Sequence, residues 1–473
     1  MTIFKNKTFR ARMRWPSGRL AVEKFLFLGA VSASLLLAGA ELETVTNKNT
    51  MEKKMKESEY GATLKTVNDY EGKTDNERIE AAIRGRNGNI VIIPKRISDI
   101  EPERTWWKLD RAILLPSNTT IVLRDCKIKL SDRCRDNFFR SANCGLGIED
   151  PQPMENIHIK GIGCCILEGA DHPRSTGDGG KILACPCPRS PNLGYTERHA
   201  HTYGTDALVK GESQYGDWRN IGILLAKVSH FSIENIRIVE QHAWAISLED
   251  CAYGRVSHID FSASQKRVID GAEHNVENQD GVNLRNGCHD IIVSDITGKT
   301  GDDVIALTAI ASQAKLRKSG ELKSTHVLGN DWARREKGIR NVIIRNVLAY
   351  PAGGCSIIRL LGMAGGEIHN VSIDNVVDTS PDDFHVYDDI ALGKAPGTYS
   401  IGYGEQFPQA LFNINISNVI GNARHSVRVL GGFQNSCISN VINRNPAGIS
   451  LKIDNPDLII DSVQSGIVNR KTP

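Results

Sequence analysis

Three aspartates are the residues of this sequence best suited to chemistry. Asp280 follows Asn278, and Asp302 and Asp303 come 22 and 23 residues after Asp280. A structural repeat of that length would bring the three carboxylates together on one surface. Crowded carboxylates cannot all ionise easily, so the pKa of one of them should rise. A protonated carboxyl beside an ionised carboxylate is the pair that hydrolysis of a glycosidic bond requires.

Two other interpretations of the aspartates compete with catalysis. Aspartate and asparagine are common in turns, and grouped carboxylates can hold Ca²⁺. The spacing of one repeat between Asp280 and the Asp302–Asp303 pair favours catalysis, without a metal or cofactor. Both members of an adjacent pair can face outward only at a bend, and we expect Gly281 and Gly301 to supply that backbone freedom. A carboxyl separation of roughly 6.5–9.5 Å would leave room for water and imply inversion.

The elements that must position these aspartates form a repeat. From residue 154 onward the chain repeats a short run of alternating apolar residues with Asn or Asp near its middle. The basic step is about 22–29 residues, and the 51 residues between Ile296 and Val347 are interpreted as two coils. Alternation predicts strands with one buried face, and no helical stretch separates them. We therefore predict an all-β fold, a right-handed parallel β-helix in which the recurrent Asn residues stack and are structural.

The start of the repeat region predicts a cap. Thr74 and Glu77 form a capping-box pattern, which predicts a short helix with Ile79, Ala82 and Ile83 on one face. Such a helix would cover the open end of the β-helix and protect its edge. We expect one domain over residues 61–473, with loop insertions near 170–217 and 309–338 that flank the aspartates. Loops on a rigid scaffold often add binding specificity, although these could also be plain surface loops.

The aspartate segments resemble glycoside hydrolase family 28, the polygalacturonase family. The family's N-x-D motif falls on Asn278 and Asp280, and its D-D motif falls on Asp302 and Asp303. The resemblance extends from about residue 66 to 465 and is strongest over 219–307. It implies that Asp302 is the general acid and that Asp280 and Asp303 hold and deprotonate the attacking water. It also implies that Asn278 contacts the substrate, a pectic or other acidic polysaccharide or oligosaccharide.

The sequence departs from the family at two motifs. The Gly-His-Gly motif would fall on residues 353–355, where Cys355 follows two glycines and the histidine is absent. The Arg-x-Lys motif, which in the family grips the substrate carboxylate, has no clear match near residues 380–390. Arg359, His385 and Tyr387 are the candidates for substrate binding in their place. These losses bear on the specificity for galacturonate more than on hydrolysis.

The N-terminal residues predict export. A basic start, the apolar run from Phe25 to Ala38 and the small residues before Glu41 are the three parts of a signal peptide, which we place at residues 1–40. The apolar run is shorter than the roughly 20 residues that span a membrane. Residues 41–60 are polar and aperiodic and read as a flexible linker. We expect an extracellular or periplasmic protein, not held at a membrane after cleavage.

The net charge supports this division. The full chain has 58 Lys+Arg against 55 Asp+Glu, a balance of +3. Residues 1–40 hold seven bases and one acid, so the remainder has 51 bases and 54 acids, a balance of −3. Nucleic-acid binding would require a basic surface, so we expect no nucleic-acid partner. Nothing in the sequence predicts the oligomeric state.

The 11 cysteines allow several interpretations, and their odd number leaves at least one thiol unpaired. We interpret the cysteines beside apolar runs as buried thiols that pack as small hydrophobic side chains; these are Cys251, Cys288, Cys355 and Cys437. A second group could ligate zinc, although a disulfide or free thiols are favoured there; it comprises His172, Cys185, Cys187, His199 and His201.

Two other functions stay open. A β-helix polysaccharide lyase or epimerase would use a Lys, Arg or His base, usually with Ca²⁺, and no such group matches the aspartates in quality. A non-catalytic glycan-binding β-helix would retain the aspartates without turnover. Sensitivity to a chelator and unsaturated products would indicate the lyase, and unchanged behaviour of an Asp302→Asn variant would indicate the binding protein.

Overall fold

The computed structural model describes residues 65–85, 89–132, 134, 136–144, 151–171, 220–269, 271–276, 278–310, 338–363, 365–393, 410–454, 456, 459–460 and 463–468. These residues belong to one compact unit, Lys65–Pro473. The predicted signal peptide, the linker, most of both insertions and the cysteine–histidine group around Cys185 lie outside the described residues.

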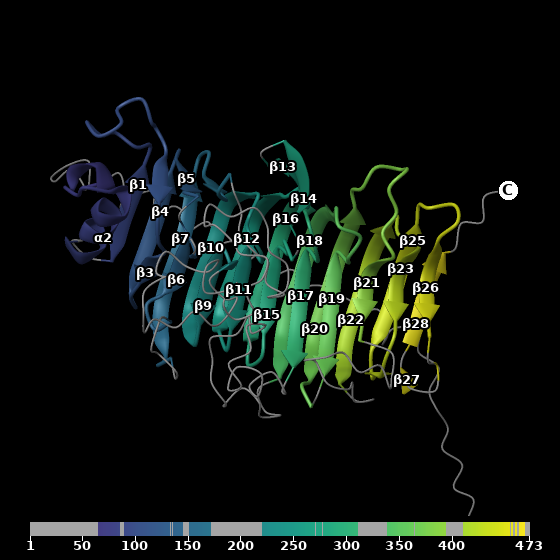
Figure 1. The fold of residues 1–473 in the computed structure, drawn as a ribbon. Helices are drawn as coiled ribbons and strands as arrows, with labels where there is room; N and C mark the ends of the chain where they lie inside the picture. The colour runs from purple at the N-terminus through teal and green to yellow at the C-terminus, as the bar shows by residue number, and fades with distance from the viewer. Residues whose placement is uncertain are drawn as a thin grey trace, which may run out of the picture. The chain divides into compact units, whose positions relative to one another are not determined.

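Most of the described residues form two long sheets in which every strand pairing is parallel (Figure 1). The main path of the first sheet consists of β1 (Ile90–Pro94), β4 (Thr119–Arg124), β7 (Met154–Ile162), β10 (Val228–Val239), β12 (Ala252–Ser262), β16 (His289–Thr300), β18 (Ile339–Pro351), β20 (Ile368–Asp378), β22 (Leu411–Gly421), β24 (Phe433–Gln434) and β27 (Ile459–Ile460). Five further strands pair beside this path: β2 (Trp107–Leu109), β5 (Lys127–Leu130), β8 (Ile166–Glu168), β25 (Cys437–Asn443) and β28 (Val463–Val468).

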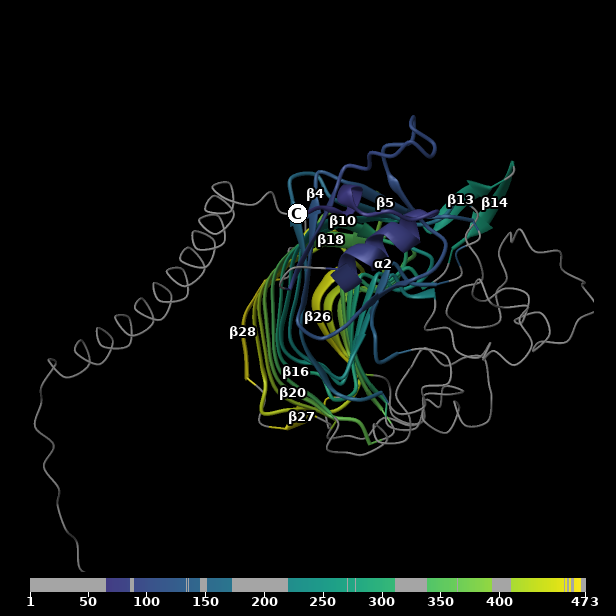
Figure 2. The same ribbon diagram turned by 90° about the vertical axis from the view of Figure 1, so that its left-hand side faces the viewer.

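The second sheet consists of β3 (Ile113–Leu115), β6 (Phe139–Ser141), β9 (Ile223–Ala226), β11 (Ile246–Glu249), β15 (Val282–Arg285), β17 (Ile305–Ile310), β19 (Ile358–Met363), β21 (Asp388–Leu392), β23 (His425–Val429) and β26 (Ile449–Ile453). The chain alternates between the two sheets, and successive coils stack behind one another (Figure 2). The predicted fold, a right-handed parallel β-helix with a short N-terminal helix, is confirmed.

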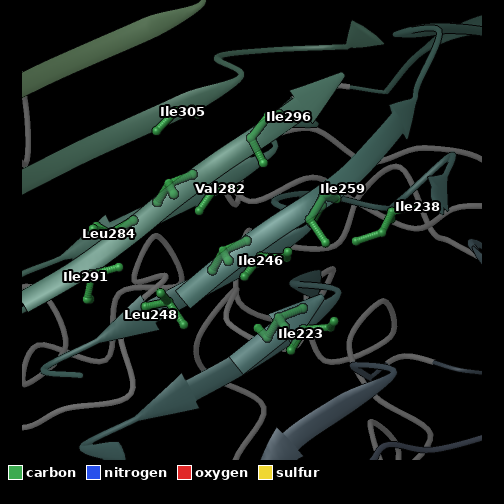
Figure 3. Close-up of a cluster of buried hydrophobic side chains, with 14 of the residues drawn as sticks. Ile223, Ile238, Ile246, Leu248, Ile259, Val282, Leu284, Ile291, Ile296 and Ile305 are labelled. Carbon is green, nitrogen blue, oxygen red and sulfur yellow. The ribbon is translucent and has the colours of Figure 1, made fainter. Parts of the chain in front are cut away.

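The core is built from rows of aliphatic side chains between the sheets. In the second sheet Ile223, Ile246, Val282 and Ile305 occupy equivalent positions on successive strands and are fully buried. Figure 3 shows these side chains in a row, with residues of the first sheet such as Ile259 beside them. Each such side chain contributes about 1.5–3 kcal/mol by leaving water. The rows therefore hold consecutive coils in register.

Asparagine ladders bend the strands of the first sheet. The side-chain Nδ2 of Asn341 donates to Asp290 Oδ1, that of Asn370 to Asn341 and that of Asn413 to Asn370, each over 3.0 Å. These residues have φ between 54° and 55°, the left-handed conformation that Asn tolerates better than most residues. The recurrent Asn residues of the repeat form a parallel ladder, in which Asn346 Nδ2 donates to Asp295 Oδ1 over 2.9 Å and Asn375 Nδ2 donates to Asn346 Oδ1 over 3.0 Å, so their predicted structural role is confirmed.

One prediction about the repeat was wrong. Strands β16 and β18 pair directly, and Ile296 is aligned with Val347. The 51-residue step is therefore a single coil that carries a long insertion, and not two coils. A count of residues cannot distinguish these cases, because an insertion and an extra coil lengthen the chain equally.

The N-terminal end is capped as the sequence predicts. Helix α2 (Asp75–Gly85) follows the short helix η2 (Val67–Asp69), and the backbone N–H of Glu77 donates to Thr74 Oγ1 over 3.2 Å. The side chains of Ile79, Ala82 and Ile83 are buried. Figure 2 shows α2 across the end of the stacked coils. No helix in the described ranges is both long enough and apolar enough to cross a membrane.

A hairpin stands out beside the coils. Strands β13 (Lys266–Ile269) and β14 (Ala272–Asn275) pair antiparallel and project from the body of the β-helix (Figure 2). The hairpin lies in the chain between β12 and the turn that begins at Asn278. It is therefore joined directly to the first aspartate segment.

Candidate active site

The candidate residues lie where each coil passes from the first sheet into the second. Val282, Ile305, Ile358, Ile390 and Val427 are aligned on successive strands. Counting back from these positions gives two further sets of equivalent residues. The first, which we call the acid row, consists of Asp280, Asp303, Ser356, Asp388 and His425. The second, which we call the outer row, consists of Gln279, Asp302, Cys355, Tyr387 and Arg424. Neighbouring members of a row are about 4.8 Å apart along the sheet.

Backbone hydrogen bonds extend this alignment into the turns. The N–H of Gly281 donates to the carbonyl of Asp303 over 2.9 Å, and that of Val304 donates to the carbonyl of Ser356 over 3.0 Å. The structure thus brings Asp280, Asp302 and Asp303 together, as the one-coil spacing predicts. We call these three residues the Asp trio.

Specific contacts orient the carboxylates of the Asp trio. Asp280 Oδ2 accepts a hydrogen bond from Asn283 Nδ2 over 3.1 Å. Asp303 Oδ1 accepts from the backbone N–H of Ser356 over 2.7 Å, and the backbone N–H of Asp303 donates to Asp302 Oδ1 over 2.8 Å. Because most of these partners are backbone groups or strand residues, the β-helix itself holds the trio in place.

Burial and mutual repulsion keep protons on the trio. Burial, followed by the charges of Asp302 and Asp303, raises the pKa of Asp280 well above its ordinary value. Burial and then the charge of Asp302 raise the pKa of Asp303 to about 7, although Arg359 and the backbone N–H of Ser356 oppose the shift. Asp280 and Asp303 therefore hold protons up to higher pH than ordinary aspartates do, in line with the predicted rise of a pKa in the trio.

Gly281 and Gly301 are required for a different reason from the one that the sequence suggests. Gly281 and Gly301 do not have positive φ, and the left-handed residue of this turn is Asn278, with φ of 56°. A Cβ at Gly281 would lie 2.4 Å from the carbonyl oxygen of Val304, and one at Gly301 would lie 2.6 Å from Gln279 Oε1. Glycine is required here because neighbouring coils approach closely, and not because the backbone must bend.

The four predicted substrate-binding residues are placed differently from one another. Asn278 is half-buried next to the trio, and its Nδ2 has no hydrogen-bond partner among the described residues. Arg359 is half-buried on β19, and its charge lowers the pKa values of both Asp303 and Asp388. Tyr387 lies in the outer row and is 48% exposed. His385 is exposed, and its Nδ1 lies 2.8 Å from the carbonyl oxygen of Asn422, so it contacts the neighbouring turn.

Sequence reasoning missed a second polar group on the same face. Asp388 Oδ1 lies 2.7 Å from His425 Nδ1, and each side chain is only 8% exposed. Arg428 Nη1 lies 3.6 Å from Asp388 Oδ2. Burial raises the pKa of Asp388, and the hydrogen bond from His425 opposes this shift. The pairing of Asp388 with His425 depends on the alignment of β21 with β23, and no motif in the sequence predicts it.

The structure places Cys355 in a different environment from the one that the sequence predicts. The sequence places it beside an apolar run and predicts a buried thiol, but the structure shows it half-buried in the outer row next to Asp302. Its thiol forms a hydrogen bond with Asp302, and burial together with the carboxylates of the trio raises the pKa of the thiol far above its ordinary value. The thiol therefore stays protonated and can donate to Asp302.

The sulfur and oxygen atoms of Cys355, Asp302 and Asp303 lie within 4.8 Å of one another, a spacing that a metal ion could bridge. A metal would have to displace the proton that the raised pKa keeps on the thiol. The arrangement therefore favours a hydrogen-bonded acid cluster over a metal centre.

We expect Cys355→Ala to lower the rate of any reaction that uses Asp302 by about tenfold and to change its pH profile. The reason is that the thiol can donate to the carboxylate that forms when Asp302 gives up its proton, and a hydrogen bond to a charged group stabilises it by about 1.5–3 kcal/mol. Rates of glycan hydrolysis between pH 4 and 9 would measure the effect. Cys355→Ser should retain most of the activity because a hydroxyl can also donate. Cys437→Ser, a half-buried cysteine on β25, is the matched control, and a wild-type profile for Cys355→Ala would contradict the assignment.

Fold and site together define a parallel β-helix protein with a cluster of partly buried carboxyls where the coils pass from the first sheet into the second. No protein-family model matches the sequence, and no curated protein matches it. Among solved structures, the family 28 exopolygalacturonase of Yersinia enterocolitica matches at 14% identity, covering 86% of this chain and 77% of its own, with a TM-score of 0.45.

Two further solved structures match this chain. The polygalacturonase of Erwinia carotovora ssp. carotovora matches at 11% identity over 85% of this chain and 94% of its own, with a TM-score of 0.45. The surface adhesin PfbA of Streptococcus pneumoniae matches at 12% identity over 86% of this chain and 92% of its own, with a TM-score of 0.35. None of these likenesses assigns a reaction to this chain, so the reaction must be argued from the site.

Proposed function

We propose that this protein is an exported glycoside hydrolase that cleaves an acidic polysaccharide or oligosaccharide with inversion at the anomeric carbon. The observation that carries the proposal is the Asp trio on adjacent turns, where burial and repulsion raise the pKa of Asp303 to about 7. A carboxyl whose pKa lies near neutrality beside further carboxyls allows one group to act as general acid and another as general base in one site.

The reaction divides between two roles. One protonated carboxyl donates its proton to the glycosidic oxygen while the bond from that oxygen to the anomeric carbon breaks. An ionised carboxylate accepts a proton from water as the water oxygen bonds to the opposite face of the same carbon. By its resemblance to family 28, Asp302 takes the role of general acid, and Asp280 and Asp303 hold and deprotonate the attacking water. Because the three carboxyls titrate as a coupled group, their protons are shared among them before substrate binds.

Residues around the trio can hold the sugar rings. Trp244 lies one coil before Asp280, and the guanidinium of Arg285 stacks over its ring at 4.5 Å. Arg359 lies one coil after Asp303, and its positive charge opposes the rise in the pKa of that carboxyl. An aromatic group on one side and a cation on the other would orient an acidic glycan across the trio.

A screen of pectic and other acidic glycans tests the proposal. We expect new reducing ends from at least one of them, in the presence of EDTA, with the inverted anomer seen first by proton NMR. Unsaturated products and loss of activity with EDTA would instead indicate a lyase. Binding without products would indicate a glycan-binding protein. The N-terminal sequence of the exported protein tests the leader, which we expect to be removed after Ala40.

A further inference from the structure

We propose that the face of the second sheet on the C-terminal side of the Asp trio contains a subsite for a negatively charged group of a glycan, built from Tyr387 and Arg424. This proposal rests on the proposed function for the glycan and adds a separate binding site to it. We call Tyr387, Arg424 and Arg428 the cationic patch. Arg424 lies one coil beyond the segment, residues 380–390, in which the family resemblance places its substrate-binding cations.

The position of the cationic patch is set by the outer row. Tyr387 is two coils beyond Asp302 and Arg424 is three coils beyond it, roughly 10 Å and 14 Å along the sheet. The backbone N–H of His425 donates to the carbonyl of Tyr387 over 3.1 Å, so this alignment continues through the turns. A glycan that crosses the trio in the direction of the stack would therefore pass over Tyr387.

Tyr387 has the properties of a stacking platform. Its ring is 48% exposed, yet it is held on several sides. His425 packs against it at 5.3 Å with an interplanar angle of 74°, and the guanidiniums of Arg428 and Arg424 lie 4.9 Å and 5.4 Å from its centre. An aromatic ring that is fixed by its neighbours loses little conformational entropy when a sugar ring packs on it.

The arginines of this face differ in whether a carboxylate pairs with them. Arg428 Nε lies 2.8 Å from Asp454 Oδ2, and Arg428 also faces Asp388, so its charge is compensated. Arg424 is exposed and Arg359 is half-buried. In the described part of the chain, no carboxylate oxygen lies within 4.0 Å of either guanidinium. The charge of Arg359 acts on Asp303 and Asp388, so Arg424 is the available positive charge next to Tyr387.

This local charge differs from the character of the chain as a whole. Without residues 1–40 the chain has 51 bases against 54 acids, so the cationic patch is not part of a general basic surface. Guanidiniums bind planar carboxylates and the oxygens of sulfate esters through paired N–H donors. The ligand is therefore an anionic sugar, carrying either a carboxylate or a sulfate ester.

Calorimetric titration of the full chain carrying Asp302→Asn tests the subsite without turnover. The probes are oligogalacturonides and a sulfated oligosaccharide, each compared with its methyl-esterified or desulfated neutral form. We expect one anionic probe to bind about tenfold or more tightly than its neutral form, with affinity that falls as salt rises. Which probe shows the difference identifies the anionic group.

Variants in the same background locate the effect. Arg424→Gln should weaken the anionic probe by about five- to tenfold and leave the neutral form unchanged, whereas Tyr387→Ala should weaken both. The matched control is Arg345→Gln, an exposed arginine on β18 of the first sheet. Thermal unfolding of each variant checks that it is folded.

The outcomes distinguish a failure of the proposed subsite from a failure of the proposed hydrolase. Equal affinity for anionic and neutral probes, equal effects of Arg424→Gln and Arg345→Gln, or no binding of any probe would overturn the subsite. If hydrolysis is detected with any of these results, the proposed function stands alone. If no glycan is cleaved but anionic probes bind through Arg424, the subsite stands and the hydrolase does not.

Discussion

Asp302→Asn is expected to lower glycan hydrolysis by at least about 10²–10⁴-fold while substrate affinity changes little. The amide keeps the shape of the side chain and cannot donate a carboxylic proton to the leaving oxygen. Turnover should fall and KM should stay close to the wild-type value, because the lost interaction acts in the transition state. Initial rates of reducing-end release from the glycan found in the screen would measure both quantities.

The control for this experiment is the same chemical change elsewhere. Asp99→Asn alters an exposed aspartate near the N-terminal cap and should leave activity unchanged. Asp280→Asn and Asp303→Asn should reduce turnover in the same range, since each removes a carboxylate that holds and deprotonates the attacking water. A residual rate above a tenth of the wild-type rate in Asp302→Asn would show that Asp302 is not the general acid.

The second large effect is on stability, and it depends on pH. Asp303 is expected to destabilise the fold at alkaline pH, so Asp303→Asn should raise the free energy of unfolding there. The pKa of Asp303 is raised from 3.8 to about 7 in the folded chain. Below pH 4 the carboxyl is protonated in both states and matches the amide. Between about pH 4 and 7 the unfolded chain ionises this carboxyl while the folded chain keeps it protonated, so stability falls across this range and the loss is complete once the pH is above 7.

The size of the effect follows from the shift. Each pKa unit corresponds to about 1.4 kcal/mol, so the gain at pH 8 is at most on the order of 4 kcal/mol and vanishes near pH 4. Denaturant midpoints at the two pH values would measure it, with Asp99→Asn as the control. An equal gain at both pH values, or a loss at pH 8, would contradict the raised pKa. A variant that is more stable and inactive is typical of a residue retained for function.

Several features were predictable from the sequence because they are local and repeated. Period-two alternation identifies strands with one buried face, and the short step between Asp280 and Asp302 contains no insertion. The trio therefore follows from counting residues. The cap follows from Thr74 and Glu77, since capping acts within a single helical turn. The asparagine ladders belong to the same class, because each rung repeats the same local conformation.

Other features were decided only by the tertiary structure. The steps after the trio are lengthened by insertions, as the 51 residues between Ile296 and Val347 show, so register beyond that point cannot be counted. The thiol of Cys355 reaches Asp302 across such a step, and His425 reaches Asp388 across 37 residues. Even Gly281 and Gly301 were recognised for the wrong reason. Their requirement comes from the approach of a neighbouring coil, a contact between distant residues that only the stacked structure creates.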